Sequence, residues 1–248
     1  MIDPRCFSDC DGRYIGADKK IHQIGNFTYR TVFSGWDVFR SQFPLQTLIN
    51  PRLVNDEINS LIQIAQLSGK EYYPRWEVVN AYSGCMLGNP AISVLADAYE
   101  KGIREYDVQK AVEYAANTQK QFGNGDLGYT PGSLSHTLEY AYTDWCLGQL
   151  MSSLGKKKEA AEYEKRAKAY RNVWCDSVQW FRARVKGGGW LPWRGRTAQD
   201  QGTTESNPFQ QGWFVPHDID GMKALMGGQK KFCLLYTSPS PRDGATSR

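Results

Sequence analysis

The feature that most constrains the fold of this chain is a series of amphipathic helical segments joined alternately by short turns and by long loops. Helix-start signals stand at Asn50-Pro51 and Asn89-Pro90, where a capping residue precedes a proline at the first helical position. The apolar stripes that begin there stop at Gly69 and Gly102. We expect about seven helices, arranged as stacked helical hairpins.

Start and stop signals along the whole chain define the expected elements. Residues 1–35 are loop-like or extended, with β-prone segments at residues 14–15 and 27–33. The helices that we expect after them cover residues 36–49, 51–68, 90–101, 108–122, 134–154, 160–174 and 218–226. The predicted fold class is therefore all-α.

Long aromatic loops interrupt the helical pattern, chiefly at residues 70–88 and 179–216. All eight tryptophans lie between Trp36 and Trp213, and five of them fall in these two loops. Large aromatic side chains are costly to leave in water, so they fill a core or line a site. Long loops in compact domains are usually functional or disordered, and aromatic-rich ones rarely belong to the second group. We expect the functional site where these loops converge.

Charge and apolar runs exclude several classes of function. The 30 basic and 26 acidic residues give a formal charge of +4 and are mixed along the chain, unlike the clustered footprint of nucleic-acid-binding proteins. No apolar run approaches the roughly 18–20 residues of a membrane helix, and no export signal is visible after Met1. The sequence also lacks zinc-type histidine spacing and a GxSxG nucleophile motif.

Carboxylates close to tryptophans are the remaining chemical signal. They occur at Trp36-Asp37, at Trp76-Glu77, and at Glu205 and Asp218 on either side of a further tryptophan. An indole face beside a carboxylate suits a sugar ring, and an adjacent indole can keep a carboxyl protonated by desolvation. The structural alternative is that Asp37 and Asp218 cap helices. Glu77 fits that alternative least, because it lies in a loop.

Residues 233–248 differ in character from the rest of the chain. They show neither helical nor strand periodicity and are rich in serine and proline. Residues 233–243 can be encoded by a transposase adapter widely used in sequencing libraries. We therefore interpret residues 233–248 as a non-native adapter translation, outside any fold reasoning. The alternative is a disordered tail.

Several of these motifs occur together, in order, in a known family. The matching segments are Ser34–Arg40, Pro44–Pro51, Pro74–Glu77, Met86–Gly88, Val94–Tyr99, Thr137–Trp145, Glu205–Asn207, Trp213–Asp218 and Leu225–Gly228. With these motifs the chain resembles the catalytic domain of glycoside hydrolase family 92, the calcium-dependent exo-α-mannosidases. The resemblance spans about residues 10 to 230.

The resemblance implies a domain plan. Members carry an N-terminal β-sandwich followed by an (α/α)6 toroid of helical hairpins. Residues 1–35 would then be the connection to a missing β-sandwich, and residues 36–232 the first half of the toroid. Export to the periplasm, the cell surface or the medium is implied for the parent protein.

The resemblance also implies a chemistry. Members remove terminal α-linked mannose from glycans with inversion, an activity suited to N-glycan degradation, and the general acid maps onto Glu77. The substrate-binding residues carried over are Trp36, Asp37, Trp76, Glu205, His217 and Asp218. A Ca²⁺ ion binds the O2 and O3 hydroxyls of mannose, and ligands near it map onto Asn207 and Gln210.

Two departures from the family pattern affect these expectations. Asn89-Pro90 stands where many members have a histidine, which leaves the preferred linkage open. The aspartates that serve as catalytic base lie in a later motif that this sequence lacks, so we expect the chain itself to be inactive. Two other interpretations remain: a sugar-binding protein without hydrolysis, or another (α/α)6 carbohydrate enzyme such as a trehalase-like hydrolase or polysaccharide lyase. The oligomeric state is also open.

Overall fold

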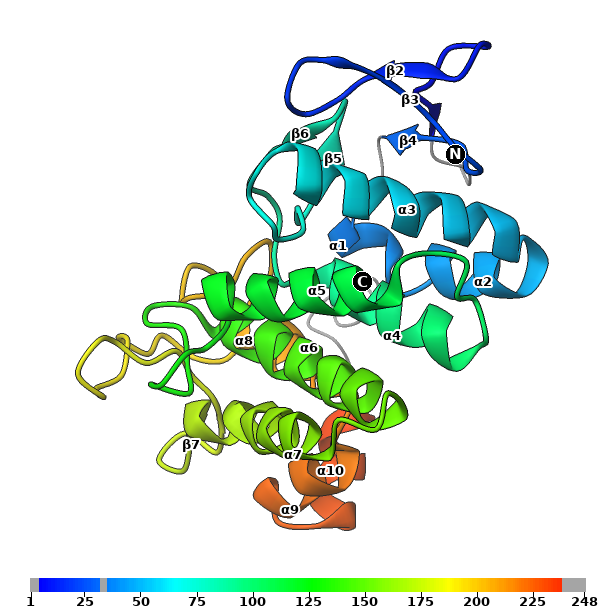
Figure 1. Cartoon of the computed structure of the whole chain (residues 1–248). Coiled ribbons are helices and arrows are strands. Elements are labelled where there is room, and N and C mark those ends of the chain that lie inside the picture. The colour runs from blue at the N-terminus through cyan, green and yellow to red at the C-terminus, as the bar shows by residue number, and fades with distance from the viewer. Residues whose placement is uncertain (1–4, 32–34, 238–248) are drawn as a thin grey trace, which may run out of the picture. The chain divides into compact units, whose positions relative to one another are not determined.

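The computed structural model of the chain consists mainly of helices, and all of its strands are short (Figure 1). It describes residues 5–31 and 35–237; Ser34 of the first motif and residues 238–248 of the expected adapter translation lie outside this range. The chain forms two compact units. Unit 1 comprises Met1–Thr130 and Ser135–Tyr170, and unit 2 comprises Pro131–Leu134 and Arg171–Arg248.

Unit 1 begins with four short strands. They are β1 (Arg5–Cys6), β2 (Arg13–Ile15), β3 (Ile21–Gln23) and β4 (Arg30–Thr31). β1 pairs with β4 and β2 with β3, both in antiparallel register. The β-prone character of residues 14–15 is confirmed, and that of residues 27–33 is confirmed at β4.

The rest of unit 1 is helical apart from one hairpin. Its elements are α1 (Gly35–Val38), α2 (Gln42–Ile49), α3 (Pro51–Leu67), β5 (Glu77–Val78), β6 (Ala81–Tyr82), α4 (Pro90–Glu100), α5 (Val108–Phe122), α6 (Leu134–Ser153), α7 (Lys157–Arg166) and the 3₁₀ helix η1 (Ala167–Val173), which runs on into unit 2. The helical architecture expected from the sequence is thus confirmed. Its closure into a toroid stays a prediction.

The predicted helix boundaries follow the capping residues. The Asn50 side chain accepts a hydrogen bond from the Leu53 N–H at 3.2 Å and so caps α3. Asp107 does the same for α5 through the Lys110 N–H, at 2.9 Å. These contacts satisfy N–H groups that have no partner within their own helix.

Two predicted helices differ from the structure. The helix expected over residues 36–49 is divided into α1 and α2. The helix expected over residues 160–174 ends at Arg166, after which the chain tightens into η1, and Trp174 lies in a strand. The apolar spacing did not distinguish an α-helix from a 3₁₀ helix here, because side chains in η1, such as Tyr170 and Val173, are also fully buried at a spacing of three.

The N-terminal segment is packed against α3. Tyr14 and Tyr29 stack with ring centroids 4.2 Å apart and form a cluster with Ile64 of α3. The Thr28 N–H donates to Asp56 at 3.1 Å, and the Arg30 N–H donates to the Ser60 hydroxyl at 2.9 Å. Residues of this segment therefore belong to the core of unit 1, and its role as the connection to a further domain stays a prediction.

Helix α6 is buried along most of its length and is joined to its neighbours by polar contacts. The Gln119 side chain of α5 donates to the Tyr140 main-chain carbonyl at 3.0 Å, and the Thr143 hydroxyl donates to the side-chain amide oxygen of Gln119 at 3.2 Å. On another side, Arg166 of α7 forms an ion pair with buried Asp144 at 3.1 Å. Figure 1 shows α5, α6 and α7 in green, in succession along the chain.

Unit 2 is smaller and has an aromatic core. Its elements are β7 (Trp174–Cys175), β8 (Trp180–Phe181), α8 (Pro208–Gln211), α9 (Ile219–Leu225) and α10 (Gln229–Tyr236). Trp180 is fully buried and contacts the rings of Phe209 and Trp213. At least these two tryptophans therefore build a core. The helix expected over residues 218–226 is confirmed as α9.

Across residues 5–31 and 35–237, every helix falls short of the length and apolar character that crossing a bilayer requires.

Asp144→Asn should flatten the pH dependence of stability. Burial raises the pKa of Asp144 to about 7, against the lowering influence of Arg166. An unfolded aspartate ionises near pH 4. The folded state therefore holds more protons between about pH 4 and 7, and stability falls as pH rises through this window, by about 1.4 kcal/mol for each pKa unit.

Melting temperatures followed by circular dichroism from pH 4 to 7 measure this slope. Part of it should persist in the variant, because burial also raises the pKa of Glu139 to about 7. The control is Glu159→Gln on the exposed face of α7, a residue that does not contribute to the pKa of Asp144, and it should keep the whole slope. Equal slopes for Asp144→Asn and the control would contradict the prediction.

Candidate functional site

Trp36 and Asp37 are carried by α1, which is held tightly against the loop that contains Trp76. A Cβ atom on Gly35 would lie 2.7 Å from the Arg75 carbonyl oxygen and 2.8 Å from Pro90. Only glycine allows this approach. Two motifs about 40 residues apart in the sequence are thereby brought together, with Trp36 half-buried and Asp37 exposed.

Glu77 lies at the start of the β5–β6 hairpin and is almost completely buried, at 1% exposure. The two central residues of the hairpin, Val79 and Asn80, both have positive φ, as in a type I′ turn. This turn directs the Asn80 N–H to the Glu77 carboxylate. The Thr31 hydroxyl of β4 also donates to that carboxylate, 2.6 Å from each oxygen.

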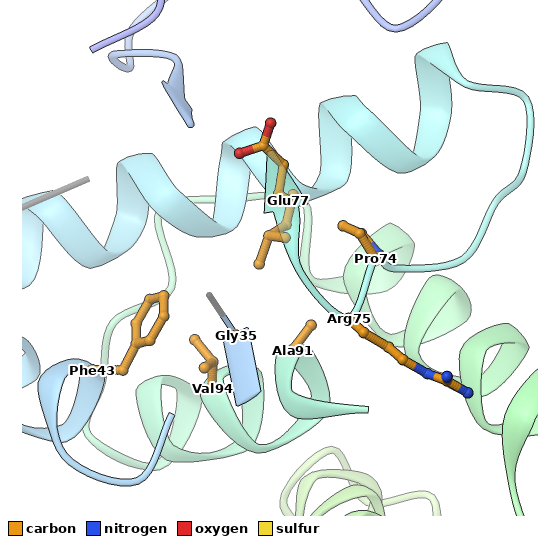
Figure 2. A pocket seen from close by; sticks show the side chains of 8 residues that line it. Gly35, Phe43, Pro74, Arg75, Glu77, Ala91 and Val94 are labelled. Atoms are coloured by element: carbon orange, nitrogen blue, oxygen red, sulfur yellow. The ribbon is translucent and has the colours of Figure 1, made fainter. Parts of the chain in front are cut away.

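The cavity beside Glu77 is too small for a sugar. Its volume is about 10 Å³, enough for a single water molecule at most. In Figure 2 the carboxylate of Glu77 points away from the apolar side chains of Phe43, Ala91 and Val94, which line the cavity. Glu77 thus faces Thr31 and its own hairpin in this structure.

A second carboxyl group, Glu139 of α6, contacts the predicted substrate-binding tryptophan directly. The Trp36 indole N–H donates to the Glu139 carboxylate at 3.1 Å, although the two residues are 103 positions apart. Glu139 is 3% exposed, and burial raises its pKa to about 7, while the Trp36 hydrogen bond and the Arg40 charge lower it. The Arg40 guanidinium lies 5.2 Å from the centroid of the Trp36 ring.

Further polar residues of α6 contact the Trp76 loop. The Arg75 guanidinium donates to the Tyr140 hydroxyl at 2.5 Å. The His136 ring lies 5.4 Å from the Tyr140 ring, centroid to centroid. Burial, and to a smaller extent the Arg75 charge, lowers the pKa of His136 to about 4, so this imidazole is neutral at neutral pH.

Unit 1 therefore brings α1, which carries Trp36 and Asp37, against the segment that carries Trp76 and Glu77. Glu139 lies within the motif Thr137–Trp145 but is not among the site residues predicted from the sequence. The sequence offers one signal for Glu139: it is a carboxylate inside a helix whose apolar residues occupy several faces. An acid buried in such a helix needs a specific partner.

The remaining predicted site residues lie in unit 2. Glu205 is exposed and has a positive φ of 52°. Asp218 caps α9 by accepting from the Gly221 N–H at 2.8 Å, and it also pairs with Arg171 at 3.3 Å. The structural alternative considered for Asp218 is thus confirmed. His217, which precedes this cap, is half-buried.

The two predicted calcium ligands form the capping box of α8. The Asn207 side chain accepts from the Gln210 N–H at 2.9 Å, and the Gln210 side chain accepts from the Asn207 N–H at 3.1 Å. Calcium takes six to eight oxygen ligands. Two amide oxygens that already accept hydrogen bonds do not fit a calcium site by themselves. Within the described part of the chain, no group of three or more histidine, cysteine, aspartate and glutamate side chains is arranged to hold a metal.

Comparison with known proteins gives consistent matches along the chain. Residues 1–234 match the family model of the glycosyl hydrolase family 92 catalytic domain. A family GH92 α-mannosidase from Bacteroides thetaiotaomicron is 30% identical, with a TM-score of 0.90 over 96% of this chain and 34% of that one. The same enzyme is also solved in complex with mannoimidazole.

Two further relatives are also glycosidases. An inverting mannosidase of family GH92 from Bacteroides thetaiotaomicron is 30% identical, with a TM-score of 0.86 over 99% of this chain and 36% of that one. An uncharacterized secreted glycosidase from Arthroderma benhamiae is 29% identical over 193 residues, which are 58% of this chain and 25% of the relative. The chain thus spans about a third of the solved mannosidases and a quarter of the curated relative.

Gly88→Ala should destabilise the protein more than Gly84→Ala. Both glycines have positive φ, 65° and 78°, so both substitutions strain the backbone. A Cβ at position 88 would in addition lie 3.1 Å from a carboxylate oxygen of Glu139, whereas nothing lies within 4 Å of one at position 84. We expect about 1 kcal/mol for Gly84→Ala and about 1–3 kcal/mol more for Gly88→Ala, from crowding. Urea denaturation of both variants measures the difference, and equal losses would show that Gly88 is not packed against Glu139.

Proposed function

The chain belongs to glycosyl hydrolase family 92, and from this membership we propose that the full-length protein carrying it is an exo-acting α-mannosidase that removes terminal α-linked mannose with inversion. The observation that carries the proposal is the family match over residues 1–234. The secreted glycosidase among the relatives supports a protein exported to the periplasm, the cell surface or the medium.

The side chains around α1 suit a terminal sugar. Half-buried Trp36 offers an apolar ring surface, and the adjacent Asp37 carboxylate is exposed and able to accept hydrogen bonds from hydroxyl groups. The mannoimidazole complex of the Bacteroides enzyme supports mannose as the recognised sugar. An N-glycan is the source of terminal α-mannose that we propose as substrate.

We propose Glu77 as the general acid that protonates the leaving oxygen. Inverting glycosidases place acid and base carboxyls about 6.5–9.5 Å apart so that a water molecule fits between them. In this structure the Glu77 carboxylate accepts hydrogen bonds from Thr31 and Asn80. Protonating a glycosidic oxygen therefore requires it to exchange these partners for the substrate.

The rest of the machinery belongs to the longer protein. We propose that the catalytic base lies outside this sequence, so that the 248-residue chain alone is inactive. We also propose Ca²⁺ as cofactor, with Asn207 and Gln210 as two of its ligands; when bound, it would hold vicinal hydroxyls of the sugar. Because these two residues do not complete a calcium site, no catalytic step is assigned to the ion.

A second candidate function is sugar binding without hydrolysis. The observation that favours it is the burial of Glu77 beneath Thr31, which a purely structural carboxylate would also show. Binding of an α-mannoside without release of mannose would distinguish this function from hydrolysis.

The full-length protein should release mannose from α-mannosides, and a calcium chelator should abolish this activity. Mannose release is measured with α-linked disaccharides, in EGTA and after excess Ca²⁺ is restored. Recovery with Ca²⁺ is expected if the ion is part of the site. Full activity in the chelator would refute the cofactor, and binding without release would establish the second candidate.

Glu77→Gln should reduce kcat by about 10²–10⁴-fold, the usual contribution of a general acid. Glutamine keeps the shape of the side chain and an acceptor oxygen for Thr31, so the fold should survive, as the melting temperature would verify. Glu113→Gln, on an exposed face of α5, is the matched control and should keep wild-type kcat. A normal kcat in a folded Glu77→Gln enzyme would assign Glu77 to the support of the hairpin.

A further inference from the structure

The orientation of Trp36 is restrained by one group on α6 and by one in the turn that follows α1. Its indole N–H donates to Glu139 of α6 at 3.1 Å. From α1 onward the chain turns so that the Arg40 guanidinium lies 5.2 Å from the indole centroid, and Arg40 also donates to the Trp36 carbonyl at 2.9 Å. The ring is therefore restrained at its edge, and its backbone is restrained by Arg40.

Glu139 is itself immobilised. It projects from α6, which is buried along most of its length, and Gly88 lies so close that a Cβ there would be 3.1 Å from one carboxylate oxygen and 3.2 Å from the Glu139 Cβ. Gly88 has a φ of 65°, which favours glycine. The carboxyl group is thus packed between the indole and the Gly88 turn.

A carboxyl group in this place costs the fold stability. At 3% exposure it has lost its hydration, and burial raises its pKa to about 7. A leucine or methionine would fill the same volume without this penalty. The hydrogen bond from the neutral indole N–H and the Arg40 charge compensate only part of this cost, so packing alone gives no reason for an acid at position 139.

We infer that Glu139 is a positioning residue, which holds the Trp36 indole at the angle that lets a terminal sugar stack on it beside Asp37. The inference rests on the proposed function and extends it by naming a residue that acts through Trp36. A ring already ordered in the free enzyme loses less conformational freedom when the sugar binds. Glu139 therefore contributes mainly to substrate affinity.

Three variants of the full-length enzyme distinguish the hydrogen bond to the Trp36 indole from the charge and from the volume of the Glu139 side chain. Glu139→Gln keeps an acceptor oxygen at the same distance but has no charge. Glu139→Asp keeps the charge but withdraws it by one methylene, beyond hydrogen-bond reach of the indole. Glu139→Leu keeps most of the volume and has no acceptor. Steady-state mannose release gives kcat and KM for each, and melting temperature verifies folding.

The expected pattern is a KM raised about tenfold in the Asp and Leu variants, from the cost of ordering one side chain on binding, with kcat changed less than threefold. Glu139→Gln should restore a KM close to that of the wild type. In a Trp36→Phe background, whose ring has no N–H, Glu139→Asp should have no further effect on KM. If Glu139→Leu fails to fold, the Asp and Gln pair and the Phe background still give the result.

Two outcomes would overturn the inference. A loss of kcat in Glu139→Gln, with wild-type kcat and KM in Glu139→Asp, would mean that Glu139 supplies charge or proton transfer rather than a hydrogen bond to the indole. An unchanged KM in all folded variants would reduce Glu139 to a packing role. Wild-type enzyme without activity on any α-mannoside would refute the proposed function itself, and the inference with it, so the two failures are distinguishable.

Discussion

The burial of α6 is the constraint on which unit 1 depends. A helix enclosed on most sides must find a partner for every polar side chain that it carries, because water is not available to supply one. On α6 these partners belong to different neighbours: Trp36 of α1 for Glu139, Gln119 of α5 for Thr143, and Arg166 of α7 for Asp144. Apolar packing would tolerate a rotation of α6 about its axis. Three polar contacts in different directions prevent such a rotation. The position of α6 therefore determines the geometry of the site beside α1.

Much of the secondary structure of the chain was predictable because its signals are local. A cap such as Asn50 or Asp107 acts on N–H groups within four residues of itself, so the sequence alone places the helix start. Where two local structures share one apolar spacing, the prediction was wrong: the pattern through Tyr170 and Trp174 continues through a 3₁₀ turn into a strand. The packing of residues 5–31 on α3 was beyond local reasoning, since its hydrogen bonds join residues about 28 to 30 positions apart.

The candidate site also combines residues that local motifs predict with a residue defined by a long-range contact. Motifs predicted Trp36, Asp37, Trp76 and Glu77 as site residues, and the capping role of Asp218 was foreseen as an alternative. Glu139 was missed as a site residue because its contact with Trp36 joins two residues 103 positions apart, and no local pattern marks one end of such a pair. The capping box of Asn207 and Gln210 has the spacing of three that marks a helix start in a sequence, although the family resemblance pointed to metal binding instead.

The contact between Thr31 and Glu77 bears on how such enzymes can be recombined. A boundary at residue 35 would look natural in an alignment, because β4 ends at Thr31 and the first helix begins at Gly35. The Thr31 hydroxyl, however, completes the surroundings of a carboxylate 46 positions later, and Tyr29 stacks in the cluster that covers α3. Residues 5–31 therefore form one structural piece with α3 and the hairpin that carries Glu77. A chimera that takes its helices from one parent and this segment from another would join two surfaces that had not been selected together.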